Sequence, residues 1–342
     1  MKTFIIAEAG VNHNGDVAIA KKLVDAAVEA GADAVKFQTF KAGKIVTATA
    51  AKATYQTENT GAGETQLEML KRLELSPSAH EELAGYCEKK GIIFLSTPFD
   101  AESADMLDML GMKIFKIPSG EITNKSLIEH IALKRKPIIL STGMSYIGEV
   151  EKAIGWINES WMQWNEKPQL TLLHCVSNYP ALPEDSNLLA IKTMEKAFRL
   201  PVGYSDHTPG IEVAIAAVAL GAKVIEKHFT LDRNMAGPDH KASLEPEGFK
   251  TMVKAIRSVE KSLGDGIKRP VQNEEDTKIA ARRSLVAARD IMAGKIISSD
   301  DVAVKRPGDG ILPEFKDIIV GMRAGQNIAA DSVIKWEYLK DA

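Results

Sequence analysis

Two kinds of segment alternate along the chain up to about residue 265. Short, nearly unbroken apolar runs rich in β-branched residues alternate with longer stretches in which apolar residues recur at helical spacing. Unbroken apolar runs are typical of strands covered on both faces, and spaced apolar positions are typical of amphipathic helices. We expect strands at residues 4–8, 34–38, 92–96, 113–117, 137–141, 169–175, 201–204 and 223–227.

Each of these eight strands is followed by a predicted helical segment. The predicted helices span residues 17–30, 78–90, 101–110, 125–133, 147–159, 187–198, 211–220 and 246–263. Eight strand-and-helix units in about 250 residues fit a closed (β/α)8 TIM barrel better than an open doubly wound sheet. The predicted fold class is therefore α/β, a TIM barrel followed by a small, mostly β domain.

Two segments depart from this alternation. Residues 40–75, between the second and third strands, exceed the ~2–6 residues usual for such a loop, and long loops at this end line the mouth of a barrel. After Gly264 the pattern changes to short apolar runs separated by turns, at residues 284–287, 295–296, 302–305 and 333–334. We predict a barrel domain over residues 1–265, a linker over 266–282 and a small β domain over 283–342.

Composition excludes several classes of function. The 342 residues carry 43 basic and 46 acidic side chains, and the formal net charge of −3 offers no electrostatic footprint for nucleic acid or an anionic membrane. No apolar stretch approaches the ~20 residues that cross a bilayer. No G-x-G-x-x-G turn follows the first strand, and no Walker A sequence occurs. With two cysteines, Cys87 and Cys175, and no recognisable secretion signal, we expect a reducing, cytoplasmic location.

Polar residues concentrate at the carboxyl ends of the predicted strands, where TIM barrels carry their active sites. Lys36 and Lys116 lie inside buried apolar runs, and a buried ammonium group is costly unless an anion accompanies it. Ion pairs with Glu8 or Glu226 would satisfy both lysines structurally. Alternatively, the lysines form a pocket for phosphate or carboxylate with neighbouring hydroxyl groups. The hydroxyl groups available at the strand ends are those of Thr97, Ser119 and Ser141.

Two histidines and three acidic residues complete the candidate site. His207 and His228 end adjacent predicted strands, and two imidazoles with water or substrate oxygens would suit a cation such as Mn2+; hydrogen-bonded core histidines are the alternative. Asp239 follows the last strand and either points into the mouth or lies in a solvated loop. Glu8 and Glu121 are expected inside the mouth, as general acids or bases or as acceptors for the hydroxyls of a polyol substrate.

Seven runs of residues at these strand ends resemble the sialic acid synthase family, which includes the diacetyllegionaminate synthases. The runs are residues 7–15 (AEAGVNHNG), 35–39 (VKFQT), 96–99 (STPF), 116–121 (KIPSGE), 141–144 (STGM), 205–208 (SDHT) and 226–230 (EKHFT). In the tail, residues 284–287 (SLVA) and 304–310 (VKRPGDG) resemble the antifreeze-like SAF domain of the same family. The resemblance covers nearly the whole chain.

The resemblance implies a metal-dependent condensation of phosphoenolpyruvate with an N-acylated hexosamine, giving a nine-carbon nonulosonic acid and phosphate through C–O cleavage. We expect N-acetylmannosamine as the acceptor and N-acetylneuraminate as the product. The alternative within the family is 2,4-diacetamido-2,4,6-trideoxymannose, giving N,N'-diacetyllegionaminate; Ser177 stands where some sialic acid synthases have asparagine. An alternative of another class is a non-catalytic barrel that binds a sugar or an anion.

The resemblance also implies roles for individual residues. His207 and His228 match metal ligands, with Mn2+ expected and Mg2+ or Co2+ as alternatives. Glu121 matches an acidic group beside the reacting carbons. Arg306 matches an arginine that the small domain inserts into the active site of a partner subunit, which implies a domain-swapped homodimer. The positions that match phosphoenolpyruvate-binding residues are Lys36, Gln38, Thr97, Lys116, Ser119 and Ser141. The positions that match sugar-contacting residues are Glu8, Tyr179 and Asp239.

Overall fold

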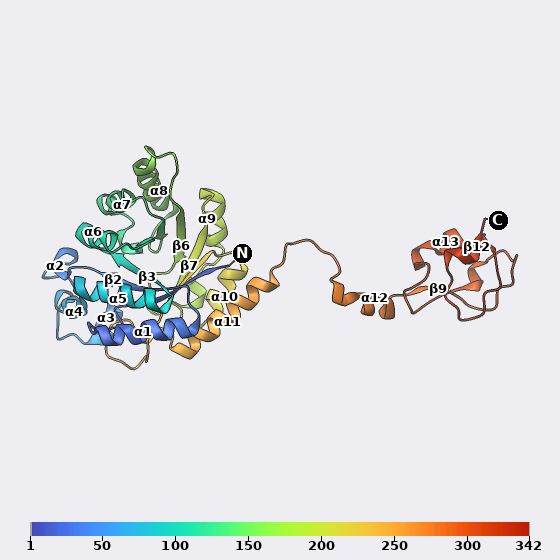
Figure 1. Ribbon diagram of the computed structural model, residues 1–342, viewed down its shortest axis with the longest axis horizontal. Coiled ribbons are helices and arrows are strands. Elements are labelled where there is room, and N and C mark those ends of the chain that lie inside the picture. The colour runs from blue at the N-terminus through green and yellow to red at the C-terminus, as the bar shows by residue number, and fades with distance from the viewer. Residues whose placement is uncertain (1, 342) are drawn as a thin grey trace. The chain divides into compact units, whose positions relative to one another are not determined.

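A computed structural model describes residues 2–341, which divide into two compact units, one ending at Gly264 and the other beginning at Asp265. The first unit contains one sheet of eight parallel strands surrounded by helices (Figure 1). The strands are β1 (Phe4–Gly10), β2 (Ala34–Thr39), β3 (Ile93–Pro98), β4 (Phe115–Ile117), β5 (Ile138–Ser141), β6 (Leu170–Cys175), β7 (Val202–Asp206) and β8 (Val224–His228).

The strand order closes the sheet into a barrel. Hydrogen-bonded ladders run in the order β3-β2-β1-β8-β7-β6-β5-β4, so the first strand pairs with the last. The two ends of this series, β3 and β4, lie side by side and complete the ring. The predicted α/β fold with a TIM barrel is confirmed, although several strands begin or end a few residues away from the predicted limits.

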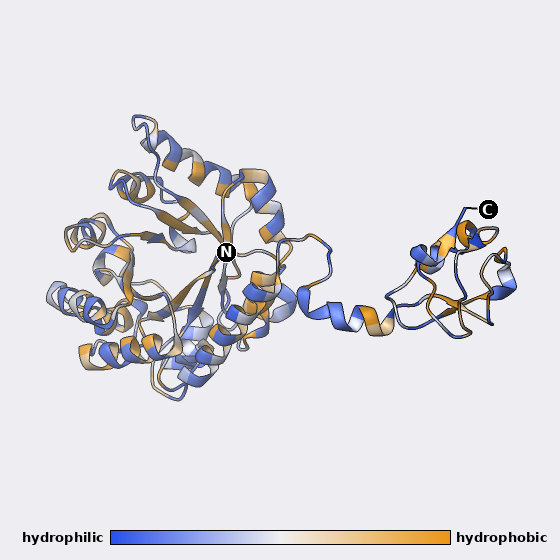
Figure 2. Cartoon of the chain, turned by 45° about the vertical axis from the view of Figure 1, so that its right-hand side comes forward, coloured by the Kyte–Doolittle hydropathy of each residue, from blue (hydrophilic) through white to orange (hydrophobic). Residues whose placement is uncertain are grey.

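Eight main helices cover the outside of the sheet. They are α1 (Val17–Ala30), α5 (Pro77–Lys90), α6 (Ala101–Met109), α7 (Lys125–Ala132), α8 (Ile147–Trp161), α9 (Ala190–Phe198), α10 (Glu212–Ala219) and α11 (Pro246–Ser262). Their ends follow from local chemistry: the Asp16 side chain accepts from the first backbone amides of α1, and Gly31 closes that helix in the left-handed conformation. Apolar residues of these helices are buried against the strands, while hydrophilic residues dominate their outer faces (Figure 2).

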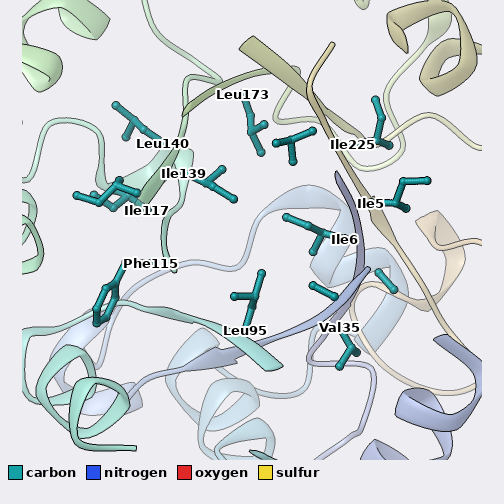
Figure 3. Close-up of a cluster of buried hydrophobic side chains, with 14 of the residues drawn as sticks. Ile5, Ile6, Val35, Leu95, Phe115, Ile117, Ile139, Leu140, Leu173 and Ile225 are labelled. Atoms are coloured by element: carbon teal, nitrogen blue, oxygen red, sulfur yellow. The ribbon is translucent and has the colours of Figure 1, made fainter. Parts of the chain in front are cut away.

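The side chains of each strand alternate between the barrel interior and the helices. Figure 3 shows Ile6, Leu95, Ile139 and Leu173 pointing into the barrel, whereas Phe115 points outward. Strand side chains alternate with a period of two, so the residue two positions after each of these also points inward. Those residues lie at or near the carboxyl ends of the strands. The apolar layer therefore fills the barrel beneath its mouth, and the next layer above it consists of polar side chains.

The long connection between β2 and α5 contains three short helices, α2 (Ala42–Ile45), α3 (Thr54–Thr60) and α4 (Gln66–Leu73), where we expected a loop. Thr65 caps α4 and forms a reciprocal capping pair with Glu68. Met69 and Leu73 of α4 pack on a separate small apolar cluster that includes Phe40. The connection is therefore anchored by its own packing.

The second unit has its own apolar core and little regular structure. Its elements are α12 (Glu275–Ala281), β9 (Ser284–Ala287), β10 (Val302–Lys305), α13 (Lys316–Ile319), β11 (Arg323–Ala324) and β12 (Leu339–Lys340). β9 pairs antiparallel with β10, and β11 with β12. The strands expected at 295–296 and 333–334 are present only as isolated bridges, because Ile296 pairs with Arg323 and Val333 with Val286. Within residues 2–341, no helix has the length and apolar character needed to cross a bilayer.

Candidate active site

The carboxyl ends of the barrel strands surround a cavity of about 330 Å³. Of the predicted site residues in the first unit, all except Glu121 line it. The predicted residues in its wall are Glu8, Lys36, Gln38, Thr97, Lys116, Ser119, Ser141, Tyr179, His207, His228 and Asp239. Other residues of the wall include Tyr55, Cys175, Ser177, Ser205 and Glu226. The strand ends thus bring together groups that are far apart in the sequence.

Both buried lysines have acidic partners. The ammonium nitrogen of Lys36 lies 2.8 Å from Oε2 of Glu8 and donates a hydrogen bond of 3.0 Å to Oγ1 of Thr97. Oε1 of Glu226 lies 3.6 Å from Nζ of Lys36 and 3.5 Å from Nζ of Lys116. The same Glu226 oxygen accepts from Oγ of Ser205 at 3.2 Å. One carboxylate oxygen therefore serves two ammonium groups and a hydroxyl.

The two carboxyl groups of this cluster differ in their proton affinity. Burial raises the pKa of Glu8 to about 7, against the opposing effect of the Lys36 ammonium. Burial acts in the same direction on Glu226, but Lys116 and Lys36 outweigh it and hold the pKa of Glu226 well below its usual range. Glu226 consequently keeps its charge, whereas Glu8 can take up or release a proton near neutral pH, as an acid-base group must.

His207 and His228 lie side by side in the cavity wall, with ring centroids 5.4 Å apart. Burial lowers the pKa of both, that of His207 to about 4, so the imidazoles are neutral. Nδ1 of His207 lies 2.5 Å from the carbonyl oxygen of Val176, so a proton on Nδ1 leaves the lone pair on Nε2, which has one long contact, 3.5 Å from Oγ of Ser205. Nδ1 of His228 is buried without a partner among the described residues. Two adjacent neutral imidazoles fit a divalent cation.

An ion pair behind the wall fixes the two histidines. Asp206 and Lys227 precede His207 and His228, face each other across the β7 and β8 ladder, and are fully buried. Nζ of Lys227 lies 2.7 Å from Oδ2 of Asp206. Asp206 also accepts from the amide and hydroxyl of Thr208. Because successive strand residues point to opposite faces, this outward pair holds the register that brings both imidazoles inward.

The histidines alone do not make a complete set of protein ligands. No group of three or more histidine, cysteine, aspartate or glutamate side chains suited to a metal occurs among residues 2–341. A cation held by His207 and His228 would take its remaining ligands from water or substrate oxygens. That arrangement leaves coordination positions open for a reacting group.

Hydroxyl groups border the lysines on the other side of the cavity. Oγ of Ser119 accepts a hydrogen bond of 2.9 Å from the amide of Gly143 and lies 3.1 Å from Sγ of Cys175. Oγ of Ser141 is buried without a partner among the described residues. An unpaired buried hydroxyl costs free energy until a ligand engages it. The lysines and these hydroxyls together form a wall suited to a phosphate or carboxylate group.

Tyr179 and Asp239 also line the cavity. The Tyr179 ring is 4.2 Å from the His207 ring and meets the His228 ring edge-on at 5.5 Å. Asp239 is buried, and burial raises its pKa to about 6. Tyr55, from α3, packs on the other side of Tyr179 with ring centroids 5.1 Å apart. The prediction missed Tyr55, although it placed the long β2 to α5 connection at the mouth.

Glu121 and Arg306 are the two remaining predicted residues. Glu121 ends the short helix η1 (Ser119–Glu121), is half-buried and accepts a hydrogen bond of 2.7 Å from Asn124. It is not part of the cavity wall, although the preceding Gly120 is. Arg306 is an exposed residue of the second unit, where its Nε donates to the carbonyl oxygen of Ala281 at 3.1 Å. The roles assigned to Glu121 and Arg306 remain predictions.

Sequence reasoning considered Glu226 only as a structural partner for the lysines and did not place it in the site. The available signal was an acidic residue inside a buried strand, two positions before a predicted metal ligand. The same period of two that brings His228 inward brings Glu226 inward as well. Glu226 is consequently the residue that links the lysine side of the cavity to the histidine side.

Two protein-family models match this chain. The model of the NeuB family matches residues 23–268, and the model of the SAF domain matches residues 282–340. The chain belongs to the NeuB family. The predicted membership in the sialic acid synthase family and the predicted SAF domain are thereby confirmed.

The relatives of this NeuB family member include synthases of several nonulosonic acids. The N,N'-diacetyllegionaminic acid synthase of Campylobacter jejuni is 50% identical over 98% of this chain and 99% of its own. The enzyme of the same name from Legionella pneumophila is also 50% identical, over 99% of this chain and 95% of its own. The crystal structure of an N-acetylneuraminic acid synthetase from Leptospira borgpetersenii, in complex with citrate, is 36% identical and superposes with a TM-score of 0.71 over 81% of this chain and 90% of its own.

The buried carboxyl of Asp239 makes the stability of the barrel depend on pH. Its pKa is near 3.8 in an unfolded chain and about 6 in the folded protein, so the folded state favours the neutral acid. Below about pH 4 the carboxyl is neutral in both states and does not lower the free energy of unfolding. As the pH rises from there through 6, ionisation of the buried carboxyl lowers the free energy of unfolding. We expect Asp239→Asn to stabilise the protein relative to wild type above pH 6, by up to about 3 kcal/mol, and to have little effect near pH 4.

Urea unfolding at a series of pH values, with a chelator present, measures this difference. Asp232→Asn, which changes an exposed aspartate after the same strand, is the matched control and should retain the wild-type pH profile. An Asp239→Asn variant whose stability differs from wild type by a constant amount between pH 4 and 8 would contradict the expectation.

Proposed function

We propose that this protein condenses phosphoenolpyruvate with 2,4-diacetamido-2,4,6-trideoxymannose, releasing phosphate and forming N,N'-diacetyllegionaminic acid. The observation that carries the reaction class is a single buried cavity that combines paired lysines with two neutral histidines. The acceptor follows from the 50% identity to two N,N'-diacetyllegionaminic acid synthases over nearly the full length of each chain. N-acetylmannosamine is the second candidate, because the Leptospira synthetase shares 36% identity.

The lysine side of the cavity suits phosphoenolpyruvate. The ammonium groups of Lys36 and Lys116, with the hydroxyls of Thr97, Ser119 and Ser141, would bind its phosphate and carboxylate oxygens through charge-assisted hydrogen bonds. Gln38, whose amide donates to Oε1 of Glu8 at 3.4 Å, borders this group. The two lysines carry as much charge as Glu8 and Glu226, so proton uptake by Glu8 would favour the binding of a further anion.

The reaction forms one carbon–carbon bond and breaks one carbon–oxygen bond. C3 of phosphoenolpyruvate adds to the aldehyde carbon of the open-chain sugar, and water adds to C2. The bond between C2 and the bridging oxygen then breaks, and phosphate leaves with that oxygen. Glu8, with a pKa of about 7, can supply the proton that the new alkoxide oxygen requires. Glu121 stays a predicted second acid or base.

We also propose that His207 and His228 hold a divalent cation, with Mn2+ expected and Mg2+ or Co2+ as alternatives. When bound, such a cation supplies Lewis-acid polarisation of the acceptor aldehyde. The carbonyl of Val176 orients His207, and the neighbouring ring of His228, 5.4 Å away, gives the second donor. Tyr179 packs on the ring of His207 and meets that of His228 edge-on, which restricts the orientation of both imidazoles.

A further part of the proposal concerns assembly. Arg306 is proposed to enter the active site of a partner subunit in a domain-swapped homodimer, where its guanidinium would donate to the N-acyl oxygen of the acceptor. The SAF domain match over residues 282–340 supports the presence of the module to which this arginine belongs. The proposed location of the enzyme is the cytoplasm, where phosphoenolpyruvate is available.

Phosphate release tests the reaction and the acceptor together. We expect the protein with Mn2+ to release phosphate from phosphoenolpyruvate in the presence of the diacetamido sugar, with a specificity constant at least about tenfold above that for N-acetylmannosamine. Label placed in the bridging oxygen should appear in phosphate, and mass spectrometry should identify the nine-carbon acid. A preference for N-acetylmannosamine would refute the acceptor, and no phosphate release with either sugar would refute the synthase assignment.

Metal binding is tested separately from turnover. Removal of a first ligand is expected to weaken Mn2+ binding by at least about 100-fold in His207→Ala and His228→Ala, measured by calorimetry on the free protein. His130→Ala, which changes a partly exposed histidine on α7, is the control and should bind Mn2+ as wild type does. Full activity after thorough chelation, or unchanged Mn2+ binding by both variants, would rule the site out.

Subunit complementation tests the domain swap. Arg306→Ala and His207→Ala should each be nearly inactive, and mixed dimers of the two should regain about half of wild-type activity, because one of their two sites is intact. In a swapped dimer one site receives both an intact histidine pair and the intact arginine, which an unswapped dimer cannot provide. No recovery in mixed dimers confirmed by mass, or a monomer in sedimentation, would reject this arrangement.

A further inference from the structure

Tyr55 is an aromatic residue of the cavity wall that comes from a connection and not from a strand end. It lies in α3, between β2 and α5, and lines the cavity together with the strand-end residues. Its ring packs on Tyr179, which in turn contacts the rings of His207 and His228. The cavity wall therefore continues in a row of rings from the histidines to Tyr55.

Contacts within the described residues hold α3 in this place. Nδ2 of Asn59 donates to the carbonyl oxygen of Pro238 at 2.6 Å, and Pro238 immediately precedes Asp239 of the cavity wall. Nζ of Lys52 donates to Oγ1 of Thr60 at 2.9 Å and to the carbonyl oxygen of Gly61 at 2.6 Å, at the end of the same helix. The Tyr55 ring is thus fixed before any acceptor binds, which lowers the entropic cost of using it for recognition.

The place of Tyr55 in this row indicates which part of an acceptor it meets. With phosphoenolpyruvate on the lysines and the aldehyde carbon beside the histidines, the remaining carbons of the sugar extend away from the reacting atoms. Among the described ring contacts Tyr55 meets Tyr179 and neither histidine, so it lies farther from the histidines than Tyr179 does and is placed to meet that far part. Its hydroxyl has one long contact, 3.4 Å from Nε2 of Gln56, so the face of the ring is the feature that this residue offers.

The two candidate acceptors differ in just this far part. The diacetamido sugar carries an acetamido group at C4 and a methyl group at C6, where N-acetylmannosamine carries hydroxyls. An aromatic face packs well against a planar amide and its methyl group, and gains little from a hydroxyl that must lose water. A site for the diacetamido sugar therefore needs an apolar surface of this kind.

We propose that Tyr55 is a specificity-determining residue whose ring packs against the C4 acetamido group of the acceptor. This inference rests on the proposed function and adds the residue that distinguishes the two sugars. Tyr55 does not touch the reacting atoms, and the phosphoenolpyruvate side of the cavity is formed without it.

Three acceptors test the proposal in wild type, Tyr55→Ala and Tyr55→Phe. They are the 2,4-diacetamido-2,4,6-trideoxy sugar, 2-acetamido-2,6-dideoxymannose, which lacks only the C4 acetamido group, and N-acetylmannosamine. In Tyr55→Ala we expect kcat/KM for the first sugar to fall about tenfold, mainly through KM, and that for the other two to change less than about twofold. Tyr55→Phe, which keeps the ring, should restore the preference, and the KM for phosphoenolpyruvate should stay unchanged.

Two further variants separate recognition from general damage. Tyr146→Ala removes a tyrosine that is 85% exposed and lies between β5 and α8, at the same end of the barrel but outside the cavity wall, and should behave as wild type. Asn59→Ala frees the end of α3 and should weaken the same preference, by a smaller factor than Tyr55→Ala.

The outcomes distinguish this inference from the proposed function. A wild-type protein that prefers the diacetamido sugar while Tyr55→Ala keeps the full preference would overturn the role of Tyr55 alone. Equal losses for all three sugars in Tyr55→Ala would likewise overturn it and indicate a structural role. A wild-type protein that condenses none of the sugars would overturn the proposed function, and this inference with it.

Discussion

Two ammonium groups buried in the mouth of the barrel are the constraint on which the site depends. Lys36 comes from β2 and Lys116 from β4, and both approach the single oxygen Oε1 of Glu226 on β8. A buried charge without a partner would cost several kcal/mol, so the strands must bring this carboxylate between the lysines. Glu8 on β1 then completes a cluster of two cations and two anions. The charge balance of this layer explains how polar residues replace an apolar core at one end of the barrel.

The free protein leaves some of these groups without partners. Oε2 of Glu226, Nδ1 of His228 and Oγ of Ser141 are all buried and lack hydrogen bonds among the described residues. Such groups lower stability in the absence of a ligand and are typical of sites prepared for one. The apolar layer beneath the mouth offsets this cost, and the paired charges of Asp206 and Lys227 hold the register of β7 and β8. On β7 and β8, outward residues therefore support the fold, and the inward residues next to them form the site.

Much of this arrangement could be predicted from the sequence, because strands have a fixed period. Alternation along β8 brings His228 inward, and the eight repeated units bring distant strand ends to one face. Alternation also brings Glu226 inward. Its function depends on which lysines meet it across the barrel, and those contacts follow only from the tertiary structure. Tyr55 could not be placed because α3 lies in a connection whose course follows from its own small apolar cluster and no periodic pattern. The hydrogen bond from Asn124 to Glu121 likewise depends on the course of the short helix after β4, and the predicted role of Glu121 stays a prediction.

The origin of Tyr55 outside the strands has a consequence for how such enzymes diverge. The groups proposed to hold phosphoenolpyruvate belong to or directly follow barrel strands, where a change of register would disturb the whole sheet. The helix α3 instead lies in the connection between β2 and α5 and contacts the rest of the cavity wall through a few side chains. Insertions and replacements in it can alter which sugars are admitted while the chemistry of the phosphate end stays intact. Evolution can therefore adjust the two halves of the cavity at different rates.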